Sequence, residues 1–273
     1  MKRRSIAYRN PIMPALALLI ASSLSAHAED TKLGWSREAI VGVATSPDYV
    51  GSDTNRAKPL LGASISYTSQ DYGVAGLGLK GLYWTFLNHD DYHVGVALSG
   101  DPGRIDHRDS GVFGSRPGSN RLAGMGSIDS TAVLSAYGDV KLGPVSLGLR
   151  ANHAMSSYKG SSVAFSVSSA PYQLQPGTTL VGSASVDWID DKAAQAYFGV
   201  TSAQAARSAF AAYTPKAGIA QSSLGLVVNQ ELTRDWKLMG EVRATELQGD
   251  AGRSPLVQRK TQPSAGLAVL YSF

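Results

Sequence analysis

Polar and apolar residues alternate with a period of two along most of the chain after residue 28. Successive side chains of a β-strand point to opposite faces, so this alternation predicts strands with one apolar and one polar face. Stretches of the same kind surround residues 162–168, 180–188 and 236–245. The clearest case lies within 145–152, where apolar residues occupy every second position: Val145, Leu147, Leu149 and Ala151.

Two architectures produce this pattern, a soluble β-sandwich and a membrane β-barrel. A sandwich buries its apolar face, whereas an outer-membrane barrel turns it to lipid in segments of about ten residues. The alternating stretches here reach about ten to twelve residues, beyond the roughly 5–6 usual in soluble proteins. Their polar face combines small with charged residues, which is typical of a narrow lumen. The candidate lumen-facing charged residues are Arg150, Asp187, Lys237, Glu241 and Arg243.

The last nine residues favour the barrel. Ala265, Leu267, Val269, Tyr271 and Phe273 share one face of a strand that stops at the end of the chain. A final strand ending on an aromatic residue resembles the signal by which the barrel-assembly machinery recognises its substrates. Tyr271 and Phe273 are therefore the candidate assembly signal.

Counting strands predicts an all-β fold, a transmembrane antiparallel up-and-down barrel. An even number of strands places both chain ends in the periplasm, with short turns there and longer loops outside. Ten strands is the alternative, because residues 72–90 could form either a tight hairpin or one broken strand. We predict twelve strands, at residues 35–45, 57–68, 72–79, 82–88, 91–99, 127–140, 144–154, 160–172, 178–189, 218–231, 235–247 and 262–273.

The first 28 residues are expected to be a signal peptide, followed by a single barrel domain over 29–273. A basic start precedes the apolar stretch 12–24, and Ala26-His27-Ala28 matches an A-x-A cleavage site. The chain has a net charge of +4, but four of its basic residues lie in this segment. Removing them leaves 21 basic residues, equal to the 21 acidic ones. No basic excess remains for a nucleic-acid partner.

No catalytic constellation emerges from the residue types, and we expect neither an enzyme nor a cofactor. The absence of cysteine excludes a thiol nucleophile and a disulfide framework. Asp106-His107 could supply a base and its orienting group, but a polar, water-facing loop is the favoured interpretation of these residues. Asp90, Asp91 and His93 could bind a metal, yet they lie at a predicted short turn, where Asp and Asn are common.

Four segments of the chain resemble the MipA/OmpV family of outer-membrane proteins. The first is Pro47-Asp-Tyr-Val-Gly-Ser-Asp53, followed by Lys58-Pro59-Leu60, and the second is Gly103-Arg104 with Leu122-Ala-Gly-Met-Gly-Ser-Ile128. The third is Tyr197-Phe-Gly-Val-Thr-Ser-Ala-Gln-Ala205 with Tyr213 and Gly218, and the fourth is Gly249-Asp-Ala-Gly-Arg-Ser-Pro-Leu-Val257. At Arg253 the family more often has Asp. The candidate loop residues are Tyr49, Gly51, Asp53, Arg104, Tyr197, Phe198, Gly199, Gly249, Asp250, Ser254 and Pro255.

This resemblance implies a protein of the Gram-negative outer membrane, in contact with its lipid and lipopolysaccharide. It also implies a scaffold that binds envelope proteins, namely a lytic transglycosylase and a penicillin-binding protein of the peptidoglycan machinery. A narrow pore or transport channel for small polar solutes is the alternative, as is a surface-exposed adhesion or receptor protein. Opposite charges inside the barrel could pair and close it or line a narrow path, and the sequence leaves both open.

Overall fold

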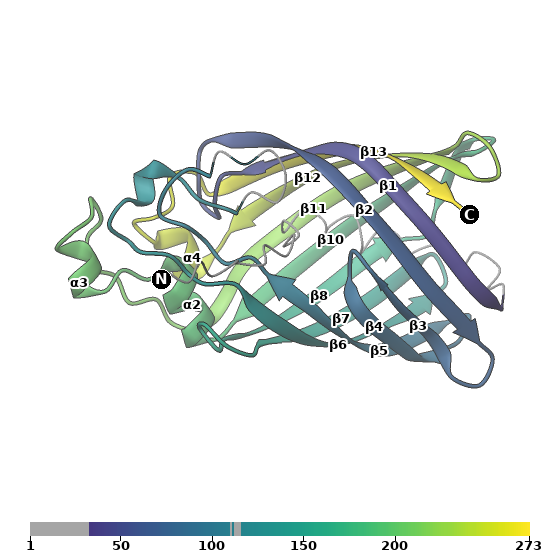
Figure 1. Ribbon diagram of the computed structural model, residues 1–273, viewed down its shortest axis with the longest axis horizontal. Coiled ribbons are helices and arrows are strands. Elements are labelled where there is room, and N and C mark those ends of the chain that lie inside the picture. Colours follow the sequence, from purple (N-terminus) through teal and green to yellow (C-terminus); the bar gives the residue numbers. More distant parts are fainter. Residues whose placement is uncertain (1–32, 110, 112–115) are drawn as a thin grey trace, which may run out of the picture.

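The structure is a computed structural model that describes residues 33–109, 111 and 116–273; the expected signal peptide lies outside them. One antiparallel sheet closes on itself into a barrel (Figure 1). Its strands are β1 (Gly34–Pro47), β2 (Asn55–Ser69), β3 (Gly73–Gly78), β4 (Gly81–Asn88), β5 (Tyr92–Asp101), β6 (Thr131–Leu142), β7 (Val145–Ala154), β8 (Ser161–Ser169), β9 (Tyr172–Gln175), β10 (Thr178–Ile189), β11 (Gly218–Glu231), β12 (Trp236–Leu247) and β13 (Thr261–Ser272).

The prediction of twelve strands is confirmed. Both β8 and β9 pair with β10, so they occupy a single position in the wall. The sequence analysis treated this position as one strand over 160–172. The structure divides it next to Pro171, where the missing N–H removes a ladder hydrogen bond. The ambiguous stretch 72–90 is a hairpin of two strands, β3 and β4, which excludes the count of ten.

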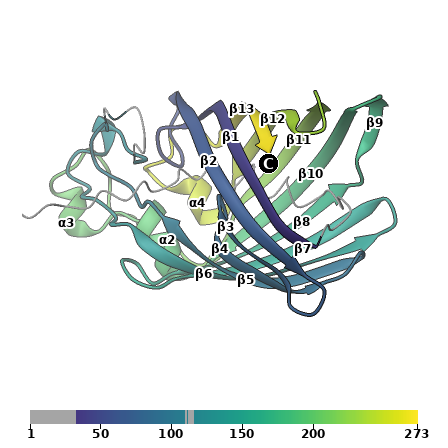
Figure 2. The ribbon, with the colours of Figure 1, turned by 45° about the vertical axis from the view of Figure 1, so that its right-hand side comes forward.

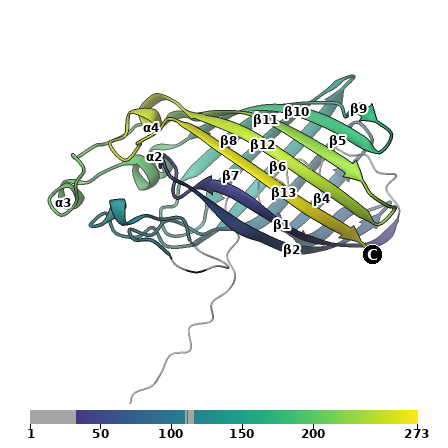
Figure 3. The same cartoon turned by 90° about the horizontal axis from the view of Figure 1, so that it is seen from above.

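The barrel closes between the first strand and the last. β1 pairs with β13 from Glu38 opposite Ser272 to Thr45 opposite Ala265, and it pairs with β2 on its other edge. Viewed from above, β13, β1 and β2 lie side by side with the C-terminus at one end of the barrel (Figure 3). Every strand pairing is antiparallel. Strands pair with their neighbours in sequence, apart from β8 with β10 and the closing pair β1 with β13, as expected of an up-and-down barrel.

The two ends of the barrel differ in their connections. The short turns lie at the end that also holds Gly34 and Phe273, and we call it the short-turn end. The opposite, long-loop end carries the helical segments η2 (Asn120–Leu122), α2 (Asp191–Phe198), α3 (Ser202–Ala205) and α4 (Gly249–Arg253), which gather beyond the strands in Figure 2. No helix within the described part of the chain is long and apolar enough to cross a membrane.

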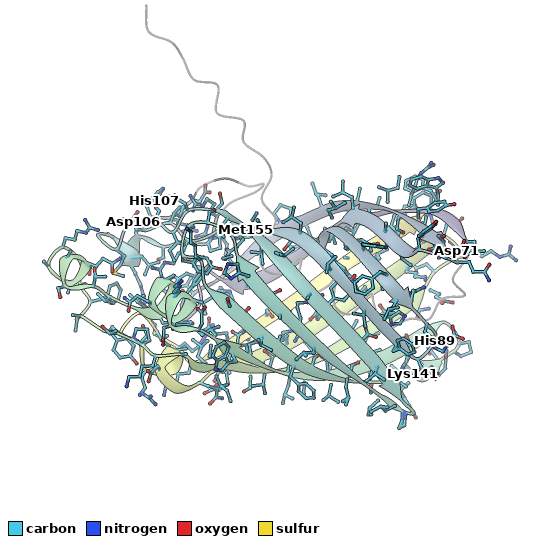
Figure 4. The ribbon with its side chains drawn as sticks, turned by 90° about the horizontal axis from the view of Figure 1, so that it is seen from below. Asp71, His89, Asp106, His107, Lys141 and Met155 are labelled. Atoms are coloured by element: carbon cyan, nitrogen blue, oxygen red, sulfur yellow. The ribbon has the colours of Figure 1, made fainter. Side chains whose placement is uncertain are left out.

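The outer surface of the wall is apolar. Exposed side chains include Val41, Leu149, Leu224 and Leu267, each from the middle of a strand. At the short-turn end aromatic rings pack together, with 5.2 Å between the ring centroids of Trp35 and Tyr67. In Figure 4, Asp71, His89 and Lys141 mark the short-turn end, and Asp106 and His107 mark the long-loop end. An apolar band with an aromatic girdle is what a lipid-facing barrel surface requires.

The interior is partly apolar, which the alternation did not predict. A buried cluster forms along β1, β2 and β11 to β13, and Leu79 of the β3–β4 turn packs against it. Its buried members are Ile40, Leu60, Val227, Met239, Ala268 and Leu270, each at most 5% exposed. One side of the lumen is therefore packed like the core of a soluble protein.

Candidate functional site

The connections at the long-loop end fold together into one unit, which we call the cap (residues 48–54, 102–109, 116–130, 190–217 and 248–260). Its core joins five side chains, each at most 2% exposed, from four separate connections: Tyr49, Leu122, Met125, Val200 and Leu256. A second cluster packs α2 and α4 against the ends of β11 and β12 through Phe198, Ala220, Leu247 and Ala251. The cap thus has a hydrophobic core of its own above the strands.

Buried hydrogen bonds join the cap segments. The Tyr49 hydroxyl donates to the carbonyl of Leu256 at 3.1 Å. The Ser254 hydroxyl, next to the half-buried Pro255, donates to the carbonyl of Phe198 at 2.6 Å. Arg104 is 3% exposed, and its Nη1 donates to the carbonyl of Tyr197 at 2.9 Å. Each of these bonds joins segments far apart in sequence and satisfies a carbonyl that would otherwise be buried unpaired.

Gly51 occupies a position that only glycine fills without strain. Its φ is +99°, and a Cβ there would lie 2.9 Å from the Val257 side chain. Its N–H donates to Oε1 of the buried Gln262 at 3.1 Å. Gly249 likewise has a positive φ of +50° at the start of α4. Gly199 ends α2 with an ordinary φ of −81°, but a Cβ would clash with Gln195.

Charged side chains lie around the edge of the cap. Asp53 and Arg121 form an exposed ion pair at 3.1 Å. Asp250 accepts a hydrogen bond from the backbone N–H of Lys216 at 2.8 Å and pairs with Arg253. The Lys216 N–H, together with Arg253, holds the pKa of the Asp250 carboxyl below its usual value. Arg253, where the family more often has Asp, therefore binds an acid three residues earlier in α4.

Asp101 ties the top of the barrel wall to the cap, a contact the sequence analysis missed. Its carboxylate accepts hydrogen bonds from the hydroxyls of Tyr158 at 2.8 Å and Tyr197 at 2.5 Å. Burial raises the pKa of both tyrosines, and the neighbouring carboxylate raises it further. Tyr158 and Tyr197 belong to different connections, so no local spacing in the sequence could reveal that they share one acceptor.

Glu241 and Arg243 form a buried ion pair inside the barrel. The side chains are only 7% and 9% exposed, and Nη2 lies 3.0 Å from Oε1. Asp187 accepts a hydrogen bond from Nε2 of Gln221 at 2.9 Å. The structure thus pairs two of the five candidate lumen residues directly with each other.

Arg150 and Lys237 are both half-buried. The Arg150 guanidinium lies 5.1 Å from the centre of the Tyr137 ring. The Tyr137 hydroxyl is in turn 2.7 Å from Oγ1 of Thr85. The structure therefore stacks Arg150 on an aromatic ring rather than bringing it to the Glu241–Arg243 pair.

Comparison with known proteins identifies the family of this chain. Residues 40–273 match the family model described as MltA-interacting protein MipA. The chain belongs to the MipA family. It is 25% identical over 260 residues to the MltA-interacting protein of Escherichia coli K12, covering 95% of this chain and 97% of that protein. The relative from Shigella flexneri has the same identity and coverage.

Among solved structures, this MipA-family barrel is similar to two outer-membrane proteins. One is the COG4313 outer membrane channel from Pseudomonas putida F1, with a TM-score of 0.49, 13% identity, and 90% of this chain and 99% of that chain covered. The other is the NanC porin, with a TM-score of 0.45, 11% identity, and coverage of 86% and 98%. Membership of the MipA family, together with the closed sheet and its apolar outer surface, identifies an outer-membrane β-barrel protein.

The segments that resemble the MipA family meet in the cap core. Tyr49 comes from the first segment, Leu122 and Met125 from the second, Val200 from the third and Leu256 from the fourth. Residues that must fit together in one core constrain each other's size and position. Packing of the cap core therefore involves all four segments.

In this MipA-family chain, the residues considered for catalysis lie at the long-loop end and those considered for a metal at the short-turn end. His107 and Asp106 are 3.3 Å apart, but the His107 side chain is 66% exposed, and Asp106 also accepts the N–H of Gly126. His93 contacts Asp139 at 2.8 Å rather than Asp90 or Asp91. Within residues 33–109, 111 and 116–273, no group of three or more His, Cys, Asp or Glu side chains is placed to hold a metal.

Tyr271 and Phe273, the candidate assembly signal, lie at the short-turn end. The Tyr271 ring packs 4.6 Å from both the Trp236 and the Phe273 rings, measured between centroids. The N–H of Phe273 donates to the carbonyl of Arg37 at 3.0 Å, although its side chain is 74% exposed. The final backbone bond thus completes the pairing of β13 with β1, and the ring remains accessible.

Proposed function

We propose that this barrel is an outer-membrane anchor for peptidoglycan-processing enzymes, which dock on its periplasmic rim. The proposal follows the name of its relatives, MltA-interacting protein. A lytic transglycosylase is the first partner and a penicillin-binding protein the second. The short-turn end is the periplasmic one, because bacterial outer-membrane barrels have their short turns on that side.

The observation that carries the proposal is the contrast between the two ends of the barrel. The long-loop end is covered by a cap with its own buried core, and part of the lumen is filled by apolar side chains and a buried ion pair. Such an interior supports a role in binding rather than in free diffusion of solutes. The rim at the other end remains available to proteins of the periplasm.

At the short-turn end β9 offers a suitable docking element. Its four residues are exposed on both faces, and it pairs with β10 only. Tyr172 is 67% and Leu174 is 51% exposed. An exposed strand edge with alternating aromatic and aliphatic side chains fits the addition of an extended segment from a partner. Figure 2 shows β9 at the tip of the barrel, away from the cap.

Binding of the purified transglycosylase to the barrel in lipid nanodiscs tests this function. The double variant Tyr172→Ala/Leu174→Asp is expected to weaken binding about tenfold or more, because it removes the side chains of the exposed edge. Lys192→Ala, an exposed residue of α2 at the opposite end, is the matched control and should bind like the wild type. Equal affinity of all three proteins would contradict docking at β9, and absence of binding would contradict the anchor role.

Conductance in planar bilayers separates this role from the pore. A sealed anchor gives no steady single-channel openings. Regular openings that change when Arg150 is replaced would instead favour a narrow path for polar solutes along the charged part of the lumen.

A further inference from the structure

The barrel wall is incomplete on one side. β2 pairs with β1 along its whole length, but β3 pairs only with the last five residues of β2, Ile65–Ser69. β3 has six residues, fewer than the roughly 9–11 that a tilted strand needs to cross a membrane. Across the gap, β5 loses its partner β4 after Leu98. In Figure 1 the β3–β4 hairpin stops well short of the cap.

We call the break in the wall the window. Its long edge is residues 55–64 of β2, its short edge is 99–101 of β5, and the Leu79–Lys80 turn closes it at the bottom. At the top the cap reaches β2, where Nη1 of Arg56 donates to the carbonyl of Asp109 at 3.0 Å.

The hydrogen-bond register shows which backbone groups face the window. The N–H of Phe273 donates to the carbonyl of Arg37, so odd-numbered residues of β1 face β13 and even-numbered ones face β2. Their partners in β2 are even-numbered too, as in Gly42 opposite Leu60. The Asp48 N–H likewise donates to the Thr54 carbonyl, and both of these residues are even-numbered. The odd-numbered residues of β2 therefore turn their backbone groups into the window: Ala57, Pro59, Leu61 and Ala63.

None of these four residues makes a hydrogen bond on that side with a described residue. On the other edge, the N–H of Lys141 in β6 donates to the carbonyl of Asp91. Odd-numbered residues of β5 therefore turn their backbone groups to β6, and the even-numbered Gly100 turns its own into the window. A Cβ added to Gly100 would meet only open space. No strand pairing joins the two edges within the described part of the chain.

A second strand is unsuited to this gap. Pro59, in the middle of the long edge, has no N–H to donate, and Pro102 follows directly after the short edge. Proline on an exposed edge is one of the devices that prevent strand addition. Backbone groups in contact with hydrocarbon need partners, since each unpaired group there costs several kcal/mol, and they are tolerated where they line a water-filled cavity. Water in the adjoining part of the lumen would satisfy these groups at the window.

The membrane side and the lumen side of the window differ in polarity. Its membrane side is apolar, with Leu61, Leu77, Leu82 and Leu98 each between 43% and 58% exposed. Arg56 and Lys58 share the inward face of β2 with the buried Leu60.

Among the inward cations, Arg56 is already paired with Asp48 at 3.0 Å. Lys58 makes no ion pair or hydrogen bond with any residue of the described chain. The nearby acidic side chains already have partners. Asp48 pairs with Arg56, Glu38 accepts a hydrogen bond from the Ser64 hydroxyl, and Asp109 has contacts of its own. Lys58 is thus an inward cation beside the window that is available to a bound anion.

We propose that the window binds a single-chain amphiphile with an anionic head group. The tail lies in the membrane among the exposed leucines around the window, and the head reaches through the wall to the Lys58 ammonium. This site is independent of the rim where enzymes are proposed to dock, and it needs no opening of the cap.

Hydrogen exchange tests the window itself in the full-length mature barrel in phosphatidylcholine nanodiscs. The amides of Leu61 and Ala63 should exchange at least a hundredfold faster than those of Leu60 and Gly62, whose N–H groups face β1. An alternating pattern of this kind supports a hydrated edge. Equal protection of all four amides would overturn it.

Binding of 11-(dansylamino)undecanoate, a fluorescent carboxylate with a single chain, tests the ligand. Lys58→Gln should weaken its binding about tenfold, whereas Lys141→Gln, an exposed lysine at the short-turn end, should leave it unchanged. A probe with the same tail and a trimethylammonium head should bind weakly to the wild type. The heat-induced gel shift checks that each variant is folded. Unchanged binding to Lys58→Gln, or equal binding of both probes, would refute anionic recognition.

Discussion

Breaking the buried ion pair inside the lumen is expected to destabilise the barrel strongly. Glu241→Leu removes the carboxylate and leaves the Arg243 guanidinium, 9% exposed, with no acidic group within ion-pair distance among the described residues. An uncompensated buried charge of this kind costs about 3–5 kcal/mol. The free energy of unfolding should fall by that amount in urea titrations of the refolded protein in detergent, followed by the fluorescence of its four tryptophans.

A double variant separates the ion pair from general damage to the lumen. Glu241→Leu/Arg243→Leu removes both charges, and replacing a buried pair by apolar side chains is often neutral or stabilising by about 1–4 kcal/mol. It should therefore regain most of the stability lost in the single variant. Glu231→Gln, exposed near the short-turn end, is the control and should unfold like the wild type. A single variant as stable as this control, or a double variant no better than the single one, would refute the reasoning.

Three further predictions concern the wall, the cap and the C-terminus. Leu149→Arg, on the exposed face of β7, should lower the free energy of unfolding by about 2–4 kcal/mol if it lies near the membrane midplane. Arg150→Leu should lower it by about 0.5–2 kcal/mol, because the stacking on Tyr137 is lost. Equal urea midpoints of the two variants would contradict the assignment of Leu149 to lipid and Arg150 to the lumen. Because the folded-state pKa of Tyr158 and Tyr197 is raised, their contribution to cap stability is complete below pH 10 and is lost as the pH rises above it. Absorbance at 295 nm should show a late tyrosine ionisation that is reduced in Tyr197→Phe. Deletion of Phe273 should lower the yield in the outer membrane much more than the stability of refolded protein, and an unchanged yield would show that the residue is dispensable for assembly.

The strands could be predicted because lipid outside and a lumen inside impose alternation on each of them. In β7 the period of two is nearly perfect, and Leu149 is exposed while the next residue is half-buried. The hairpin of β3 and β4 was ambiguous, because its two strands are short and glycine-rich. Its turn is fixed by Gly81, whose φ of +84° suits the tight connection after Lys80.

The apolar side of the lumen could not be predicted from alternation. In β13 the outward face carries Leu267 and Tyr271, but Ala268 and Leu270 on the other face are apolar too, and they are buried. A period of two separates the faces of a strand without indicating what lies opposite either one. The contact of Leu270 with Ile40 and Leu60 depends on barrel closure, and so did not show in any local pattern.

The structure of the cap could not be predicted from the sequence for a different reason. Tyr197-Phe-Gly-Val-Thr201 has the composition of a strand, yet its first two residues end the helix α2. Asp190 caps that helix by accepting the N–H of Ala193 at 2.8 Å. Packing of Phe198 against Ala220 and Leu247 decides the local structure here, and these partners are supplied by other segments.

Closure of the barrel has a consequence for the order of events during biogenesis. The hydroxyl of Thr45 bonds to the carbonyl of Ala265, 220 positions further along the chain. The first strand therefore has no partner on that edge until the last residues have been synthesised and exported. Loops of this length close slowly, and waiting strand edges are prone to aggregation. The polypeptide must consequently be kept soluble and unpaired throughout its passage across the periplasm, and any delay at its final segment leaves every earlier strand without a finished sheet.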